Sequence, residues 1–371
     1  MKTSPLIAHK GKGSTLKVIH VVQHMAPGGL ETMVLELLKQ ANDTERVFIV
    51  SLEGEMEQAL EHWPKLRPYR SHLFFLAKPS GTQITLVRTL SRLFKVLSPQ
   101  VVHTHHIGPL LYGGIAARLA KVPIRIHTEH DMWHLNCEKR QSVEGLALKL
   151  VKPILVADAC GVQQQLIELF PNTEPLLIKN GIDCDRFIPG DRLSARRALN
   201  LPAHPMMIGT AGRLETVKGQ AFLLKALARM PKHIHLAIAG IGSLDTDLKQ
   251  LCHKLDIQDR VHFLGLVDQM PTFYQSLDVF CLPSLQEGFP LSPLEAQACN
   301  IPVVVTDVGA AKETLCPLSG VVTEPQNVTS LIDSLTLTLQ TKHLFCPRDF
   351  VVENNDVRAM SQAYRNLVFK A

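Results

Sequence analysis

Two glutamates, Glu287 and Glu295, mark the segment of this sequence that is richest in chemical signal. They lie in the run Ser-Leu-Gln-Glu-Gly-Phe-Pro-Leu-Ser-Pro-Leu-Glu-Ala, from Ser284 to Ala296. The pattern predicts Glu287 on a loop and Glu295 in the first turns of the helix that follows. Loop amides and a helix N-terminus suit phosphate or sugar oxygens. A carboxylate placed one turn further into the helix suits hydrogen bonds from the hydroxyls of a ribose.

Two cations follow an expected strand in the second half of the chain. The strand covers 207–212, and Arg213 and Lys218 stand in the loop after it. Together they could clamp a diphosphate and stabilise the charge that builds up as it leaves. The alternative is a pair of solvated loop cations, but ligands of parallel α/β sheets sit at the carboxyl ends of strands, where both residues lie.

A glycine pair forms a third candidate site near the N-terminus. Gly28 and Gly29 follow the β-branched run 18–22 and precede a helical pattern. Glycines at such a turn let the backbone approach an anion, next to the free N–H groups of the helix. A tight turn with no ligand fits the same residues.

Alternating strand and helix patterns must position these residues. In the first half we expect strands at 18–22, 46–51, 101–103 and 124–128, with helices after Gly29, at 84–97 and at 110–120. In the second half we expect strands at 207–212, 235–239, 261–263, 279–282 and 303–306, with helices at 220–228 and 291–298. Strand, helix, strand at this spacing indicates parallel sheets with right-handed crossovers.

The predicted fold class is α/β, with two Rossmann-like domains that face each other across a cleft. The length of 371 residues is enough for two such domains. We expect a flexible N-terminus at 1–15, a first domain at 16–183 and a second domain at 184–351. The C-terminal helix, about 352–371, is expected to pack back on the first domain.

This set of motifs resembles glycosyltransferase family 4. Besides the glycine pair, the two cations and the two glutamates, it includes Asn180-Gly181-Ile182-Asp183 and the run from Pro302 to Gly309. The resemblance covers about Val18 to Asn366, and the motifs come in the family's order. It departs from the family's pattern at Asn300 and at Ala310, where glycine is common; asparagine tolerates the left-handed backbone.

The resemblance implies a GT-B fold and transfer of a sugar from a nucleotide donor with retention of anomeric configuration and without metal. It also implies that the first domain is the acceptor side and that the second binds the nucleotide-sugar. It assigns Arg213 and Lys218 to the diphosphate and Glu295 to the ribose. Donor contacts are also implied for Gly28, Gly29, Glu287, Gly288, Phe289 and Leu291. His130 matches the family's cleft histidine, so the implied catalytic set is His130, Glu287, Arg213 and Lys218. The leaving phosphate would itself take the acceptor's proton on the same face of the sugar.

Histidines of the first half suggest a second kind of site. His103, His105, His106, His127, His130 and His134 include spacings that can ligate a metal. No convergent Asp, Glu or Cys accompanies them, so we expect no metal and no cofactor, and we place His105 on the acceptor side.

The remaining sequence features bear on partners and location. The net charge of +5 lacks the dense Lys/Arg clustering of nucleic-acid binders, and the eight cysteines form no C-x-x-C pair. The basic, apolar pattern at 84–97 fits a helix on a membrane surface, although a helix packed on a sheet needs the same pattern. We expect a cytoplasmic protein, with contact at the inner face of the membrane as an open alternative.

The leading hypothesis is therefore a retaining glycosyltransferase. It would use a UDP- or GDP-sugar and a glycan or lipid-linked acceptor in the biosynthesis of bacterial exopolysaccharide, capsule or lipopolysaccharide. A sugar-nucleotide epimerase of the same fold and a catalytically silent scaffold subunit are the alternatives. A silent subunit would not need an intact set of cleft residues. The sequence keeps five of them: His130, Arg213, Lys218, Glu287 and Glu295.

Overall fold

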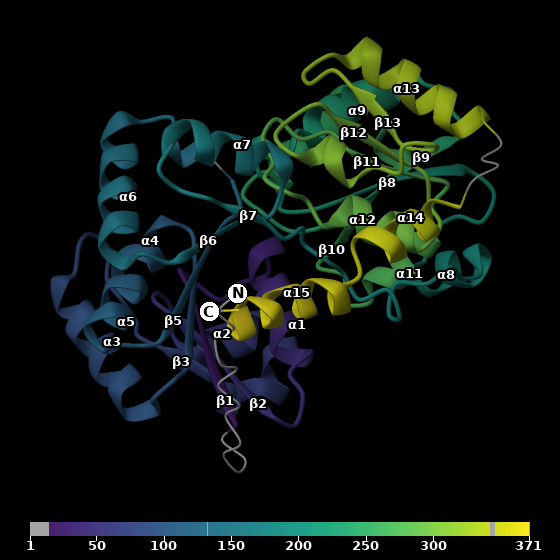
Figure 1. Ribbon diagram of the computed structural model, residues 1–371. Coiled ribbons are helices and arrows are strands. Elements are labelled where there is room, and N and C mark those ends of the chain that lie inside the picture. Colours follow the sequence, from purple (N-terminus) through teal and green to yellow (C-terminus); the bar gives the residue numbers. More distant parts are fainter. Residues whose placement is uncertain (1–14, 132, 342–345, 371) are drawn as a thin grey trace, which may run out of the picture. The chain divides into compact units, whose positions relative to one another are not determined.

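The computed structural model describes residues 15–131, 133–341 and 346–370, with residues 134 and 370 described by their backbone only (Figure 1). Two compact units divide the chain. One contains the residues up to Thr128 together with Ser142–Ile154, and the other contains Glu129–Gln141 together with Leu155–Lys370. The N-terminal segment expected to be flexible lies almost wholly outside the described residues. The expected domain limits at 183 and 351 stay a prediction.

Thirteen strands are described, and they form two parallel sheets. The seven-stranded sheet has the order β3-β2-β1-β4-β5-β6-β7, and the six-stranded sheet has the order β10-β9-β8-β11-β12-β13. The strands are β1 Leu16–Val22, β2 Glu45–Ser51, β3 Leu73–Phe75, β4 Val101–His105, β5 Ile124–Glu129, β6 Ile154–Ala157, β7 Leu176–Leu177, β8 Met206–Ala211, β9 Ile234–Ala239, β10 Val261–Gly265, β11 Val279–Leu282, β12 Val303–Thr306 and β13 Val321–Thr323.

The helices before the six-stranded sheet are α1 Gly29–Lys39, α2 Met56–His62, η1 Pro64–His72, α3 Ile84–Leu97, α4 Ile107–Pro109, η2 Leu110–Gly114, α5 Ile115–Leu119, η3 Trp133–Leu135, α6 Glu138–Val151, α7 Cys160–Leu169 and α8 Arg192–Ala198. Those that follow are η4 Thr216–Lys218, α9 Gln220–Arg229, α10 Asp245–Lys254, η5 Gln258–Arg260, α11 Met270–Gln275, α12 Ser292–Ala298, η6 Ala311–Thr314, α13 Val328–Gln340, α14 Pro347–Asn354 and α15 Val357–Lys370.

Helices cover both faces of the six-stranded sheet. On one face α13 packs against α9, which also contacts α10, and on the other α12 packs against α11 and α14 (Figure 1). Side chains of α9, α10 and α13 close over β8, β9 and β11 in one buried cluster, mainly of Leu, Ile, Val and Ala. Strands buried on both faces read as continuous apolar runs, which is why 279–282 and 303–306 could be recognised from their residues.

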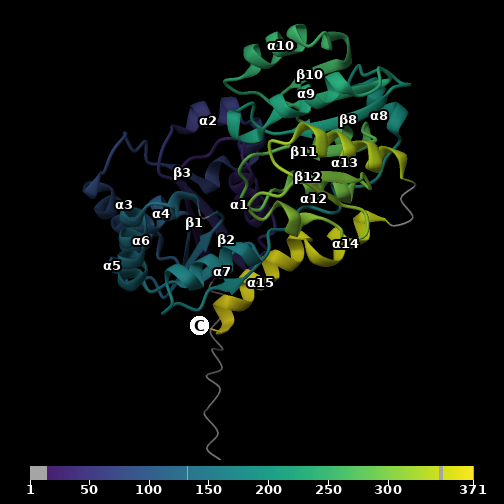
Figure 2. The ribbon, with the colours of Figure 1, turned by 90° about the horizontal axis from the view of Figure 1, so that it is seen from above.

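In the first unit, α3 and α5 pack together and cover one face of β1, β2 and β4, as Figure 2 shows from above. Leu86, Leu90 and Phe94 of α3 enter that core, whereas Arg88 and Arg92 are exposed. The apolar face of α3 is therefore used for packing on the sheet. Among the described residues no helix has both the length and the apolar character needed to cross a bilayer.

The Asn-Gly-Ile-Asp motif lies where two distant segments meet. The Ile182 amide donates to the Asn355 carbonyl at 2.9 Å, and the Val357 amide donates to the Ile182 carbonyl at 2.9 Å. The result is a parallel bridge between Ile182 and Asp356. The motif is thus joined to the start of α15 by its backbone.

Candidate active site in the six-stranded sheet

Three loops meet at the carboxyl edge of the six-stranded sheet. They follow β8, β11 and β12, which are neighbours in that sheet, and cover 212–219, 283–291 and 307–310. The Leu285 amide donates to the Val217 carbonyl at 2.7 Å, and the Ala310 amide donates to the Gly288 carbonyl at 3.1 Å. Backbone hydrogen bonds therefore hold the three loops as one group.

Glu287 is the charged centre of this group. Its Oε1 accepts a hydrogen bond from the Lys218 Nζ at 2.7 Å and another from the Ser284 Oγ at 2.6 Å. Glu287 is buried, while the Lys218 side chain is partly exposed. A buried carboxylate needs a paired charge, and Lys218 supplies it. The structure thus brings two of the predicted site residues together.

Two glycines allow these loops to approach so closely. Gly309 has a φ of +52°, and a Cβ there would lie 1.8 Å from the Glu287 carbonyl oxygen. A Cβ on Gly288 would lie 2.1 Å from the His130 carbonyl oxygen. Neither position can hold a side chain without moving the backbone beside it. Close packing therefore requires a glycine at position 288, directly after Glu287. This glycine lets the segment 129–131 lie against the Glu287 loop.

Glu295 lies in the first turn of α12 and is held from a second helix. The Tyr274 hydroxyl, on α11, donates to Glu295 Oε2 at 2.6 Å. Burial, and then the neighbouring Glu295 charge, raise the pKa of Tyr274 well above its usual value. The phenol is therefore a stable donor that fixes the direction of the carboxylate. Phe289 and Leu291 lie between the two glutamates in the sequence, and their amides were predicted to contact the donor. Both residues are buried.

Arg213 and Lys218 occupy the loop after β8 as predicted. The Lys218 side chain runs back past Gly212, where an added Cβ would lie 3.9 Å from its Cδ. Arg213 is exposed, and its carbonyl accepts a hydrogen bond from the Gln220 Nε2 at 2.9 Å. The backbone of the loop is thus fixed, while the guanidinium projects toward solvent with its charge available for an anion.

His130 is oriented by a carboxylate that the sequence analysis did not single out. Its Nδ1 lies 2.9 Å from Asp158 Oδ2, which also accepts from Asn180 Nδ2 at 2.8 Å. All three side chains are buried. A proton on Nδ1 that is shared with the carboxylate leaves Nε2 as the second reactive atom of the ring. Asp158 directly follows the strand run of β6, and that position was the available signal.

Gly28, Gly29 and His105 lie in the first unit. Gly28 is the N-cap of α1 and Gly29 is its first residue, so the expected strand–glycine–helix turn is confirmed. An added Cβ on Gly29 would meet no atom within 4 Å, so packing gives no reason for this glycine. His105 is fully buried at the end of β4, beside His20. The side chain of His134 lies outside the described residues.

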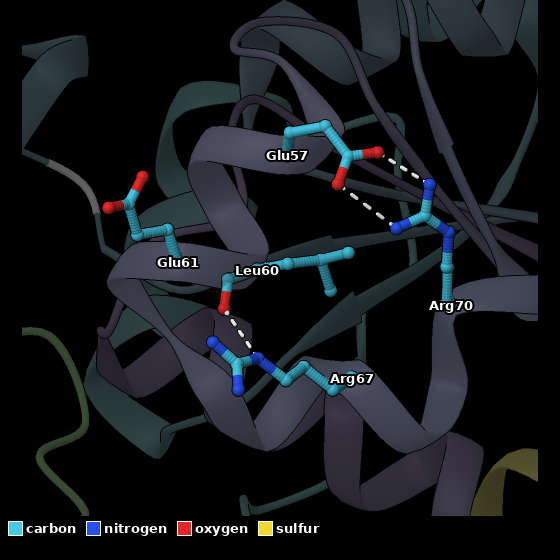
Figure 3. Close-up of a pocket in the computed structure, with 5 residues that line it drawn as sticks. All are labelled: Glu57, Leu60, Glu61, Arg67 and Arg70. Carbon is cyan, nitrogen blue, oxygen red and sulfur yellow. Dashed lines mark hydrogen bonds and ion pairs between the residues drawn. The ribbon is translucent and has the colours of Figure 1, made fainter.

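A surface hollow between α2 and η1 contains none of the predicted site residues. It is lined by Glu57, Leu60, Glu61, Arg67 and Arg70 (Figure 3). The Arg70 guanidinium binds both Glu57 oxygens, at 3.0 and 2.5 Å, and this lowers the pKa of Glu57. Arg67 Nε donates to the Leu60 carbonyl. Because two glutamates and two arginines line it, the hollow has no net positive charge to attract an anionic donor.

Two family models match the chain in succession. Residues 27–186 match the family described as Glycosyltransferase Family 4, and residues 191–349 match the one described as Glycosyl transferases group 1. Together they span most of both units and every predicted site residue. The chain therefore belongs to the family 4 glycosyltransferases.

Curated relatives agree with this assignment. The protein EpsF of Bacillus subtilis, described as a glycosyltransferase, is 27% identical over 79% of this chain and 80% of its own length. The UDP-Gal:alpha-D-GlcNAc-diphosphoundecaprenol alpha-1,3-galactosyltransferase of Escherichia coli is 31% identical over 60% of this chain and 62% of its own length. This chain thus spans less than two thirds of the second relative.

Solved structures show the same fold. The Anabaena protein Alr3699/HepE, crystallised with UDP, superposes with a TM-score of 0.81 at 21% identity, covering 96% of this chain and all of its own. WaaG, a glycosyltransferase involved in lipopolysaccharide biosynthesis, gives a TM-score of 0.71 at 16% identity, over 95% of this chain and 99% of its own. The fold is GT-B, with two Rossmann-like domains, as the sequence analysis predicted.

Proposed function

We propose that this glycosyltransferase transfers a sugar from a nucleoside diphosphate donor, with retention of anomeric configuration and without a metal ion at the donor site. One observation carries the proposal: Lys218 and Ser284 converge on Glu287 at 2.7 and 2.6 Å, beside the loop that presents Arg213. Two cations and a carboxylate at the carboxyl edge of a parallel sheet suit a diphosphate and the sugar attached to it.

Each residue has a separate task in the proposed reaction. Arg213 and Lys218 neutralise the diphosphate, whose negative charge increases as the bond to the sugar breaks. Glu295, aimed by Tyr274, accepts hydrogen bonds from the ribose. Glu287 and the amides of Gly288, Phe289 and Leu291 contact the donor sugar or its phosphate. The leaving phosphate takes the acceptor's proton, so no side chain of the protein acts as a nucleophile.

His130 is the proposed catalytic histidine. Asp158 holds its Nδ1 at 2.9 Å, which fixes the tautomer and leaves Nε2 to contact the transferred sugar. Gly28 and Gly29 keep the donor-phosphate role that the family resemblance implies. His105 belongs to the acceptor-side unit but is fully buried, so no direct contact with the acceptor is proposed for it. The donor is proposed to be a UDP- or GDP-sugar, and UDP is favoured by the printed names of the Escherichia coli relative and the HepE complex.

The acceptor is proposed to be a glycan or a lipid-linked glycan in the assembly of a bacterial surface polysaccharide. The relatives' names support this class, since the Escherichia coli enzyme acts on a diphosphoundecaprenol-linked sugar. We place the protein in the cytoplasm, where α3 can contact the inner face of the membrane. Arg88, Arg92 and Lys95 are exposed on that helix, and Ile84 and Val96 are 77% and 80% exposed. Basic and apolar side chains together suit an anionic lipid surface.

The test is a panel of UDP-, GDP-, ADP- and TDP-sugars, with EDTA present throughout. Thermal shift measures binding, and release of the free nucleoside diphosphate without acceptor measures slow donor hydrolysis. We expect a shift and release with one nucleotide family. Conversion of the donor sugar without release would instead show an epimerase. No shift and no release with any donor would contradict the proposal.

Lys218→Ala is the matched variant for this panel. We expect its turnover to fall by about 10²–10³-fold, because a fixed charge at the leaving group acts mainly on the transition state. The variant should remain folded at the assay temperature, although its thermal midpoint should fall because the buried Glu287 carboxylate loses its paired charge. Lys232→Ala, at an exposed position, is the control for loss of a positive charge. Equal turnover in the Lys218 variant and the parent would remove the clamp assignment.

With an acceptor in hand, NMR of the first product would report the anomeric configuration.

A further inference from the structure

Three histidines form a buried cluster on one face of the seven-stranded sheet. His20 on β1 pairs in register with His103 on β4, and His105 lies two residues further along the same strand. Side chains two residues apart in a strand point to the same face. Their exposed fractions are 4%, 1% and 0%. All three belong to the unit that contains the residues up to Thr128. The loops that carry Lys218 and Glu287 belong to the other unit.

The spacing of the ring nitrogens is that of ligands around one ion. His20 Nδ1 lies 3.1 Å from His105 Nε2, and one nitrogen from each of the three rings lies within 4.8 Å of the other two. Two imidazoles bound to a tetrahedral ion at about 2.0–2.1 Å place their nitrogens about 3.3 Å apart. An ion could therefore take the place of the proton that His20 and His105 share, with a nitrogen of His103 as its third ligand.

A hydrogen bond on the outer side of the cluster orients the third ring. His103 Nε2 lies 2.8 Å from the Thr128 hydroxyl on β5. Histidines that bind metals commonly use their second nitrogen in this way, which fixes the tautomer and the ring plane. Nδ1 is then the atom that His103 would present to an ion. The contact to Thr128 thus has the form of an outer-shell interaction.

We propose that His20, His103 and His105 bind one divalent first-row transition-metal ion. Imidazole nitrogens select zinc, cobalt, nickel or copper over magnesium and calcium, which prefer oxygen ligands. Three protein ligands leave a fourth position for water. The ion would join β1 to β4, which are far apart in sequence. This site is separate from the donor site, which is proposed to work without a metal.

Zinc binding to the full-length chain tests the proposal. The protein is stripped with EDTA, dialysed against buffered zinc and analysed for bound metal, and a second sample is loaded with cobalt for visible spectroscopy. We expect one ion per chain, the d–d absorption of tetrahedral cobalt and a rise in the thermal midpoint. X-ray absorption at the zinc edge should show three imidazoles. Less than stoichiometric zinc at saturating free ion, or fewer than three imidazoles, would overturn the site.

Variants locate the ion within the chain. His103→Gln and His20→Gln should each weaken zinc binding by at least about tenfold. His262→Gln is a matched control, because His262 Nε2 also lies 3.1 Å from a histidine Nδ1, that of His235, in a half-buried stacked pair. Zinc binding that survives both cluster variants, or that is lost with His262, would contradict the assignment. If the cluster variants do not fold, the absorption spectra of the unaltered protein decide alone.

The donor-site proposal and the histidine-site proposal can fail separately. Donor binding is measured with EDTA present and depends on Arg213, Lys218 and Glu287, whereas zinc is measured without a donor. Donor binding without zinc binding would reject only the histidine site. Zinc binding without a response to any donor would reject only the proposed transferase chemistry.

Discussion

The Tyr274 hydroxyl orients Glu295 from a neighbouring helix. The Tyr274 ring is fully buried and packs edge-on against Phe187, Phe273 and Phe280, with ring centroids 5.4–6.0 Å away. Its hydroxyl can therefore point in few directions, and one of these reaches Glu295 Oε2 at 2.6 Å. A rigid donor of this kind reduces the entropy that the carboxylate loses when it binds a ligand.

Tyr274→Phe should weaken nucleotide binding while the fold and the chemical step survive. The variant removes one hydrogen bond to a charged group, and we expect the affinity for the nucleoside diphosphate to fall by about tenfold. The value of kcat should change by less than about threefold, because Glu295 is remote from the reacting bond in the proposed arrangement. Calorimetric titration measures the affinity, and steady-state kinetics separates KM from kcat.

Tyr112→Phe is the control, since that hydroxyl accepts a hydrogen bond from the Gln83 amide in the other unit. An unchanged nucleotide affinity in Tyr274→Phe would show that the hydrogen bond plays no positioning role. A general loss of thermal stability would show that the hydroxyl acts in packing alone.

Residues within one motif were predictable, and residues joined across the chain were not. Glu287 and Glu295 share one loop and helix, so sequence spacing alone placed them. Tyr274 and Asp158 meet Glu295 and His130 from other elements, and only the strand order brings them there. His20 was missed for the same reason, because its neighbours are 83 and 85 residues later in the chain.

At the scale of elements, strand limits were the easiest to predict and the helix 110–120 was the least accurate. Helical structure in fact begins at Ile107 and passes through a π-helical turn, Leu110–Gly114, before α5. An added Cβ on Gly113 would lie 3.1 Å from the Val21 side chain, so the turn is packed directly on β1. Apolar periodicity does not report such contacts, and it therefore predicted one regular helix.

The pair of strands β9 and β10 should be sensitive to pH. His235 Nδ1 and His262 Nε2 lie 3.1 Å apart, and burial lowers the pKa of both rings from the usual 6.5; Arg260 lowers the pKa of His235 further. Since the folded state favours the neutral rings, the unfolded chain binds more protons below pH 6.5. The contribution of this pair to stability should be complete above that pH and should decrease as the pH falls below it.

Urea unfolding between about pH 5 and 7.5 measures this effect as the difference between the parent and His262→Gln. The parent's midpoint should fall more steeply on acidification than that of the variant. His233→Gln, at an exposed position next to the same strand, is the control and should keep the parent's slope. Parallel slopes in the parent and the His262 variant would mean that the pair does not titrate as proposed.

At the scale of the whole molecule, the two proposed ligands belong to different units. The donor loops follow β8, β11 and β12 in the unit that contains Leu155–Lys370, and the three histidines lie in the unit up to Thr128. A ligand that binds only the folded state stabilises that state by RT ln(1 + L/Kd), where L is the free ligand concentration. Local protection from hydrogen exchange can therefore assign each ligand to its own set of elements.

We expect a nucleoside diphosphate to slow amide exchange mainly in 212–219, 284–295 and 307–311, and zinc to slow it mainly in β1 and β4. Hydrogen exchange followed by mass spectrometry of the full-length chain, with each ligand alone and with both together, measures the two patterns. Exchange at the amides after Gly28 tests separately the donor role that the family resemblance implies for this turn. Protection by nucleotide that leaves all three loops unchanged would contradict the donor site, whatever the turnover. If zinc slowed exchange only outside β1 and β4, the metal could not be assigned to the three histidines, and the donor site would be unaffected.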